Sequence, residues 1–253
     1  MHHTEDVEEA VQRLALVVGV RGEYLMILRT GAVYHDTGFV KIYERNEHIG
    51  VAIAKEALPE FGYSPGQIER VGQIIMPTRL VERNGRMVQA PDSGDILQML
   101  MCDGDLDNLG RPDFFAVSEN FRRELNEYGH DMSFRQGLEL SLRFQEAHEY
   151  FTEAAKALRG EGKRRNIEEL KKVLGNSGTA IKKEELVREI ENYFSQTDFH
   201  AMPMSARGNY AFHLQLCAEY LREKKLFPDL KLYDFRDAFY VVAKFKTKAI
   251  DHL

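Results

Sequence analysis

The chain has 253 residues, 43% of them hydrophobic, and a formal net charge of −6. Such a length and apolar fraction suffice for one large hydrophobic core with a smaller appendage. The acidic balance argues against a general nucleic-acid-binding protein, whose phosphate contacts need a basic surface. A local basic pocket for one small anion remains compatible with it.

The two cysteines, Cys102 and Cys217, lie far apart in the sequence and form neither a disulfide framework nor a CxxC metal pair. We see no N-terminal leader with a basic start and an apolar middle, and no apolar run long enough to span a bilayer. We therefore expect a soluble, cytoplasmic protein with reduced thiols and no membrane contact.

The first elements are expected to be two helices. Apolar residues recur at intervals of three and four over residues 4–20, which predicts a helix with one buried face. A second helix is expected from Gly22 to the pair Thr37-Gly38, directly after His35 and Asp36. Because adjacent residues on a regular helix point about 100° apart, His35 and Asp36 can face one ion only where this helix ends.

The following segments carry clear start and stop signals. A helix is expected over residues 47–58, and the Ser-Pro-Gly-Gln sequence of residues 64–67 has the composition of a capping box at the start of the next helix. Residues 77–94 contain Asn-Gly and two further turn signals, which indicate a loop or a short hairpin. An apolar helix through residues 96–101 then leads to a group of aspartates at its end.

The remainder of the chain is expected to be helical as well, with no repeat and no alternation strong enough for a sheet. Breaks are predicted at 160–163, at 175–178 and at the prolines 203 and 228. The helices expected in this part cover residues 113–128, 133–159, 165–174, 181–194, 206–225 and 234–250. The predicted fold class is therefore all-α.

Imidazoles and carboxylates occur in an order that suits one divalent cation. His3 comes first, the pair His35-Asp36 follows, and the aspartates 103, 105 and 107 come much later. Imidazole nitrogen and carboxylate oxygen together suit a borderline or hard cation and leave a position for water or a phosphate oxygen. These residue types point to metal-assisted hydrolysis.

Four ordered blocks of the sequence resemble the HD superfamily of metal-dependent phosphohydrolases. They are residues 3–7 (HTEDV), 35–39 (HDTGF), 58–64 (LPEFGYS) and 102–111 (CDGDLDNLGR). The resemblance covers about residues 3–170, including Gln145, His148, Tyr150, Phe151 and Thr152, and is weak or absent beyond. It implies an HD-domain helical bundle over residues 1–170, followed by additional C-terminal helices of unknown role over residues 171–253.

The resemblance also implies a metal site. His3, His35, Asp36 and Asp105 would hold one divalent ion, with Mn, Fe, Co, Ni, Mg and Zn as candidates, and Asp103 is the substitute for the last ligand. A cation held in this way polarises the phosphate ester and lowers the pKa of its bound water. Asp36 is thus expected to serve in catalysis as well as in binding.

The sequence departs from the family at one position that bears on activity. Relatives often carry His-Glu before the third helix, whereas this chain has Asn46-Glu47. His48 lies about 200° round a regular helix from the position of the missing histidine, on the wrong side. We therefore expect one metal ion rather than two, and retain Glu47 as a candidate base or water-orienting residue.

Three basic residues are candidates for holding phosphate oxygens: Lys41, Arg79 and Arg111. A dianion in a partly closed site needs fixed positive charge beyond the metal. Surface charges and ion-pair partners are the more common role of such residues. The partner expected is a small phosphorylated substrate, either a monoester such as a nucleotide or a phosphodiester.

Three functions remain open at this point. The first is hydrolysis of a phosphate ester with a metal-activated water. The second is a degenerate HD domain that acts as a metal- or nucleotide-binding regulatory or interaction module, suggested by Asn46. The third makes residues 171–253 an interaction domain with the preceding part as its scaffold, since amphipathic helices pack on their own core or on a partner.

Overall fold

The computed structural model describes residues 2–43, 45–175, 183–198, 201–202, 210–227, 230, 235–240 and 242–243. The fold is all-α, as the sequence predicts. Within the described residues the strands form one two-stranded hairpin. In the same part of the chain, no helix combines the length and the apolar character needed to cross a membrane.

The chain divides into two compact units. The first comprises Met1–Val117 and Leu142–Glu169, and the second comprises Ser118–Ser141 and Leu170–Leu253. The sequence analysis placed residues 118–141 in the first domain, whereas the structure groups them with the second unit. One cause is a long-range cap, because the Asp237 carboxylate accepts hydrogen bonds from the backbone N–H groups of Phe134 and Arg135.

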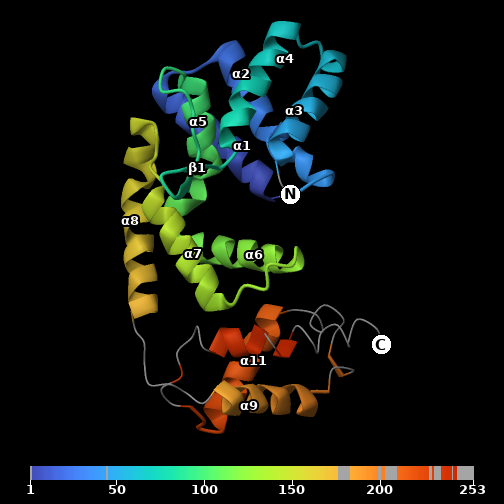
Figure 1. Cartoon of the computed structure of the whole chain (residues 1–253), viewed down its shortest axis with the longest axis vertical. Coiled ribbons are helices and arrows are strands. Elements are labelled where there is room, and N and C mark those ends of the chain that lie inside the picture. The colour runs from blue at the N-terminus through green and yellow to red at the C-terminus, as the bar shows by residue number, and fades with distance from the viewer. Residues whose placement is uncertain are drawn as a thin grey trace. The chain divides into compact units, whose positions relative to one another are not determined.

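Five helices form most of residues 2–110 in the first unit (Figure 1), and short 3₁₀ turns follow four of them. The helices are α1 (His2–Val18), α2 (Gly22–Tyr34), α3 (Asn46–Ala57), α4 (Pro65–Ile75) and α5 (Ile96–Asp105). The 3₁₀ turns are η1 (Thr37–Val40), η2 (Leu58–Phe61), η3 (Met76–Thr78) and η4 (Asp107–Gly110). Helix α1 packs against α2 and α5, and α2 packs against α4. Their apolar stripes meet in one core, where Leu14, Leu28, Ile74 and Leu100 are almost wholly buried.

Two local predictions in this unit are confirmed. Helix α4 begins with a capping box, in which Ser64 and Gln67 each bond the other's backbone N–H. Strands β1 (Val81–Arg83) and β2 (Arg86–Val88) form the expected hairpin. The turn residues Asn84 and Gly85 have φ of +52° and +74°, the left-handed conformation that a tight hairpin turn of this type requires.

The helix predicted over residues 133–159 is wrong. The structure has α6 (Phe114–Glu127), then α7 (Phe134–Ala147), a break at residues 148–152, and α8 (Glu153–Gly175). The break is made by a distant residue. The buried Asp103 carboxylate accepts hydrogen bonds from the N–H groups of Phe151 and Thr152 and from the Thr152 hydroxyl. A continuous helix would use both N–H groups within itself.

The break predicted at residues 160–163 is also wrong, because α8 continues through Gly160 and Gly162. Gly162 lies against Gly110, and a Cβ atom on Gly162 would stand 2.0 Å from the Gly110 carbonyl oxygen. This glycine permits close packing of two backbones and does not end the helix. Residues 165–174 are accordingly the second half of α8 and not a separate helix.

The second unit has a hydrophobic core of its own. Helices α9 (Lys183–Gln196) and α11 (Tyr210–Glu223) contact each other, and residues 235–240 and 242–243 are also helical. Ile190, Cys217, Leu221 and Phe239 lie in this core. The apolar stripes described here therefore pack within the chain. The breaks predicted at prolines 203 and 228, and parts of the helices predicted over 206–225 and 234–250, lie outside the described residues.

Candidate metal centre

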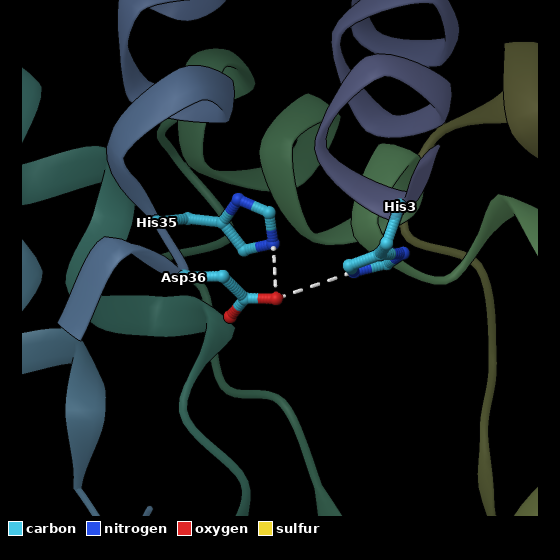
Figure 2. Close-up of side chains that lie close together, drawn as sticks. All are labelled: His3, His35 and Asp36. Carbon is cyan, nitrogen blue, oxygen red and sulfur yellow. Dashed lines mark ion pairs between the residues drawn. The ribbon is translucent and has the colours of Figure 1, made fainter. Parts of the chain in front are cut away.

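Four side chains from three distant segments converge in the first unit. The His3 Nε2 atom lies 3.4 Å from Asp36 Oδ2 and 3.3 Å from Asp105 Oδ1. The His35 Nε2 atom lies 3.2 Å and 3.3 Å from the same two oxygens. Figure 2 shows the two imidazoles directed at one oxygen of Asp36. The four residues predicted as ligands thus lie together.

The end of α2 directs His35 and Asp36 to this point. The helix ends at Tyr34, His35 is its C-cap, and Asp36 has left helical geometry, with φ of −104° and ψ of 3°. The Thr37 hydroxyl donates to the Tyr34 carbonyl oxygen over 2.8 Å, which satisfies one of the last carbonyls of the helix. His35 and Asp36 therefore stand where a helix ends, which the sequence requires if both are to face one ion.

A close backbone approach holds the next turn in place. A Cβ atom on Gly38 would stand 1.8 Å from the Asn46 carbonyl oxygen, so a glycine is needed for η1 to lie against the start of α3. This contact brings the first turn of α3, which carries Glu47, against the segment that follows Asp36.

The tautomer of His35 follows from its backbone contact. Its Nδ1 atom lies 2.8 Å from the Ala32 carbonyl oxygen, and because a carbonyl only accepts, Nδ1 carries the proton. In the neutral ring, Nε2 therefore presents a lone pair. This atom is buried and has no hydrogen-bond partner within the described residues. A lone pair facing two carboxylate oxygens requires a proton or a cation between them.

The facing carboxylates and imidazoles also shift one another's pKa values. Burial lowers the pKa of His35, but the facing carboxylates of Asp105 and Asp36 outweigh it and raise that pKa well above its ordinary value. Burial and Asp105 oppose each other in the same way at His3, whose pKa is raised. Burial raises the pKa of Asp105, yet the two imidazoles hold it well below the usual range. Positive charge is thus strongly favoured between these four groups.

The spacing also fits a cation. Nitrogen and oxygen ligands lie about 2.0–2.2 Å from a divalent transition metal, so neighbouring ligands in tetrahedral or octahedral arrangement stand roughly 3.0–3.5 Å apart. The distances of 3.2–3.4 Å between imidazole nitrogens and carboxylate oxygens fall in this range. Two neutral imidazoles and two carboxylates balance the charge of one divalent ion. The ligand atoms of His3, His35 and Asp36 all lie within 4.8 Å of one another, so these three residues fit such an ion, and Asp105 faces both imidazoles.

The three aspartates near the end of α5 have different partners. Asp105 faces the histidines, and Asp103 accepts the hydrogen bonds that precede α8. Asp107 forms ion pairs with Arg13 over 3.2 Å and with Arg159 over 2.8 Å. Residues two apart on a helix point about 200° from each other, so neighbouring aspartates cannot share one direction. On this geometry Asp105, and not its substitute Asp103, faces the histidines and is the candidate ligand.

The start of α3 contributes buried polar atoms that have no partner within the described residues. Asn46 is 5% exposed with its Oδ1 atom unpartnered, and the Oε2 atom of Glu47 is likewise buried and unpartnered. His48 is exposed and points elsewhere, with its Nε2 atom 3.5 Å from an Arg79 nitrogen. Glu47 remains a candidate base, and His48 is not part of the cluster.

The three basic candidates differ in their surroundings. Lys41 is exposed at the end of η1, close in sequence to Asp36. Arg79 lines a hollow of about 330 Å³ at the end of η3. Arg111 is bound to carboxylates of this chain, donating to Asp6 over 2.9 Å and to Asp113 over 2.8 Å. These carboxylates raise the pKa of Arg111 and satisfy its charge, so Lys41 and Arg79 are the remaining candidates for contacts to phosphate.

The sequence analysis missed Gln89. Its Nε2 atom donates to Asp105 Oδ2 over 2.6 Å and to the Thr78 carbonyl oxygen over 3.0 Å. Gln89 directly follows β2, and no motif or spacing in the sequence marks it. The contact was hidden because it depends on how the hairpin folds back on α5.

Comparison of the chain with family models, with curated proteins and with solved structures finds no match.

Proposed function

We propose that this protein is a metal-dependent hydrolase of a phosphate ester, of the type found in the HD superfamily. One observation carries the proposal: the buried, unpartnered Nε2 atom of His35 faces the carboxylates of Asp36 and Asp105, with His3 opposite. This donor set suits a borderline or hard cation that retains positions for water and substrate.

His3, His35, Asp36 and Asp105 would hold the ion. When bound, a divalent cation supplies Lewis-acid polarisation of the phosphoryl group and an acidified water. His35 donates its Nδ1 proton to Ala32 and so keeps Nε2 free for binding. Asp36 and Asp105 contribute negative charge. The centre therefore attracts a cation and repels an anionic substrate as long as no cation is bound.

The other residues of the proposed site would act on the substrate. Glu47, half-buried in the first turn of α3, is the candidate that accepts a proton from the attacking water. Lys41 and Arg79 are the candidates that hold phosphoryl oxygens, because a dianion needs positive charge in addition to the metal. The substrate class is a small phosphorylated molecule, with nucleotides among the candidates.

The proposal is tested by metal analysis of protein purified without a chelating tag, followed by a phosphoester screen. The protein is stripped, reconstituted with Mn, Fe, Co, Ni, Mg or Zn, and assayed on monoesters and diesters. We expect one ion per chain and turnover in at least one combination. Asp36→Asn should lose both, whereas Asp92→Asn, at an exposed position in the same unit, should keep both.

The outcomes separate the two leading functions. Absence of bound metal after reconstitution would reject the metal site and the hydrolase together. Stoichiometric metal without turnover on any phosphoester would instead favour a binding or regulatory module, which the presence of Asn46 in place of histidine had suggested.

A further inference from the structure

Gln89 joins the hairpin to the candidate metal centre. It stands directly after β2, is 5% exposed, and reaches Asp105, the last residue of α5. None of the four sequence blocks that resemble the HD superfamily contains it. Its contacts in the structure are therefore what indicates its role.

The two protons of the Gln89 amide have defined partners. Nε2 donates to Asp105 Oδ2 over 2.6 Å and to the Thr78 carbonyl oxygen over 3.0 Å. The reverse orientation of the amide would place Oε1 against two oxygens that only accept. The partners therefore fix the orientation of the group.

The two carboxylate oxygens of Asp105 therefore have different contacts. Oδ2 accepts from Gln89, while Oδ1 lies 3.3 Å from the Nε2 atoms of both His3 and His35. An oxygen engaged in a short hydrogen bond is a weaker ligand than its free neighbour. The arrangement presents one oxygen of Asp105 to the ion and holds the carboxylate in one rotamer.

A second observation argues against a purely structural amide. The Oε1 atom of Gln89 is buried and has no partner within the described residues. Leaving a buried acceptor unsatisfied is costly, so a side chain present only for packing would not be expected to carry one. The side-chain position that lets Nε2 reach Asp105 also leaves Oε1 unsatisfied.

We propose that Gln89 is a positioning residue that sets the metal affinity of the centre by fixing Asp105 as a one-oxygen ligand. The inference rests on the proposed metal site. It adds a residue of this chain that acts on the ion through Asp105 and does not touch it.

The test compares Mn²⁺ binding by wild-type protein, Gln89→Met and Asn166→Leu. Free Mn²⁺ is measured by electron paramagnetic resonance, and the melting temperature of each protein is measured in chelator. Met keeps the length of the side chain but removes both donors. We expect it to weaken binding about 10- to 100-fold, the usual effect of losing a residue that orients a metal ligand.

Asn166→Leu is the matched control, because Asn166 is also a buried amide of the first unit, and its Nδ2 atom donates to the Leu109 and Arg111 carbonyl oxygens and not to Asp105. It should lower the melting temperature without changing the Mn²⁺ affinity. Gln89→Asn provides a second test if the Met variant does not fold. Its arm is one methylene shorter, cannot reach both partners, and should also weaken binding.

A spectroscopic measurement distinguishes positioning from loss of structure. In Co²⁺-loaded protein the visible absorption reports the number and geometry of the ligands, so release of Asp105 in Gln89→Met should change the spectrum. Unchanged affinity and an unchanged spectrum in folded Gln89 variants would overturn this inference and leave the metal site intact. Failure of the wild-type protein to bind any of the ions would instead reject the proposed function itself.

Discussion

Two histidines are buried in the first unit, and their environments shift their pKa values in opposite directions. His35 and His148 are 1% and 5% exposed, and each has a ring nitrogen without a hydrogen-bond partner in the described part of the chain. Carboxylates facing His35 raise its pKa. His148 lies between aromatic rings, and burial together with Lys163 lowers its pKa to about 3. Burial by itself keeps an imidazole neutral, and only facing carboxylates make it a centre for positive charge.

The largest expected effect lies on the His35 side of this comparison. His35→Ala removes one of the proposed ligands, so Mn²⁺ affinity should fall at least about 100-fold, beyond the usual cost of losing an orienting residue. Phosphoester hydrolysis should fall with it. His130→Ala, at an exposed histidine of the second unit, is the control and should change neither quantity. Equal Mn²⁺ affinity in both variants would show that His35 is another neutral core histidine.

A large loss of stability is expected at Asp103, which anchors the segment that contains His148. Asp103→Ala leaves the N–H groups of Phe151 and Thr152 without their acceptor. Removing a buried charged acceptor of this kind should lower the free energy of unfolding by about 3 kcal/mol. Urea unfolding measures this. A loss within experimental error would mean that the break between α7 and α8 does not depend on Asp103.

The His148 side predicts a dependence of stability on pH. The folded pKa of about 3 lies below the ordinary value of 6.5, so between these values the unfolded chain binds more protons. The free energy of unfolding should therefore be unaffected by His148 above pH 6.5 and decrease below it. The expected contribution is about 1.4 kcal/mol per pH unit, or about 2 kcal/mol between pH 6.5 and 5.

Urea unfolding of wild-type protein and His148→Gln at a series of pH values tests this, because glutamine cannot titrate. The variant should have a shallower slope of stability against pH, whatever its absolute stability. His130→Gln, the same substitution at an exposed position, is the control for the substitution itself. Parallel curves for wild-type protein and His148→Gln would contradict the neutral, buried imidazole.

The smallest effect is expected at Arg111, whose carboxylate partners are two surface aspartates and not the cluster. Its side chain is 21% exposed, and those of Asp6 and Asp113 are 43% and 45% exposed. Partly exposed ion pairs contribute roughly 0.5–1 kcal/mol. Arg111→Gln should lower stability by about this amount and leave the KM of any phosphoester substrate unchanged. A large rise in KM would restore Arg111 as a substrate contact.

Sequence reasoning reached the features whose causes are local. The capping box of α4 and the Asn84-Gly85 hairpin turn depend on residues within four positions of each other. The condition that His35 and Asp36 must stand at a helix end follows from the angle between successive residues, and α2 ends there. The four residues carried over from the resemblance also lie together in the structure.

The predictions that failed concern features that depend on residues far away in the sequence. The break between α7 and α8 depends on Asp103, about fifty residues upstream, and Gly162 serves a backbone contact with Gly110. Arg111 was a candidate for phosphate, but Asp6 and Asp113 take its charge. Gln89 was not considered, because its partner Asp105 is set by the fold of the hairpin.

By itself, the sequence determined that this chain forms helices, where most of those in the first unit begin, and which imidazoles and carboxylates are available. Helix caps, turns and apolar periodicity act over a few residues, so their effects can be read without knowing the rest of the molecule. The tertiary structure alone decided which partners Asp103 and Asp107 take and which amide holds Asp105. Those choices depend on partners brought together by packing, and packing joins residues that no local pattern connects.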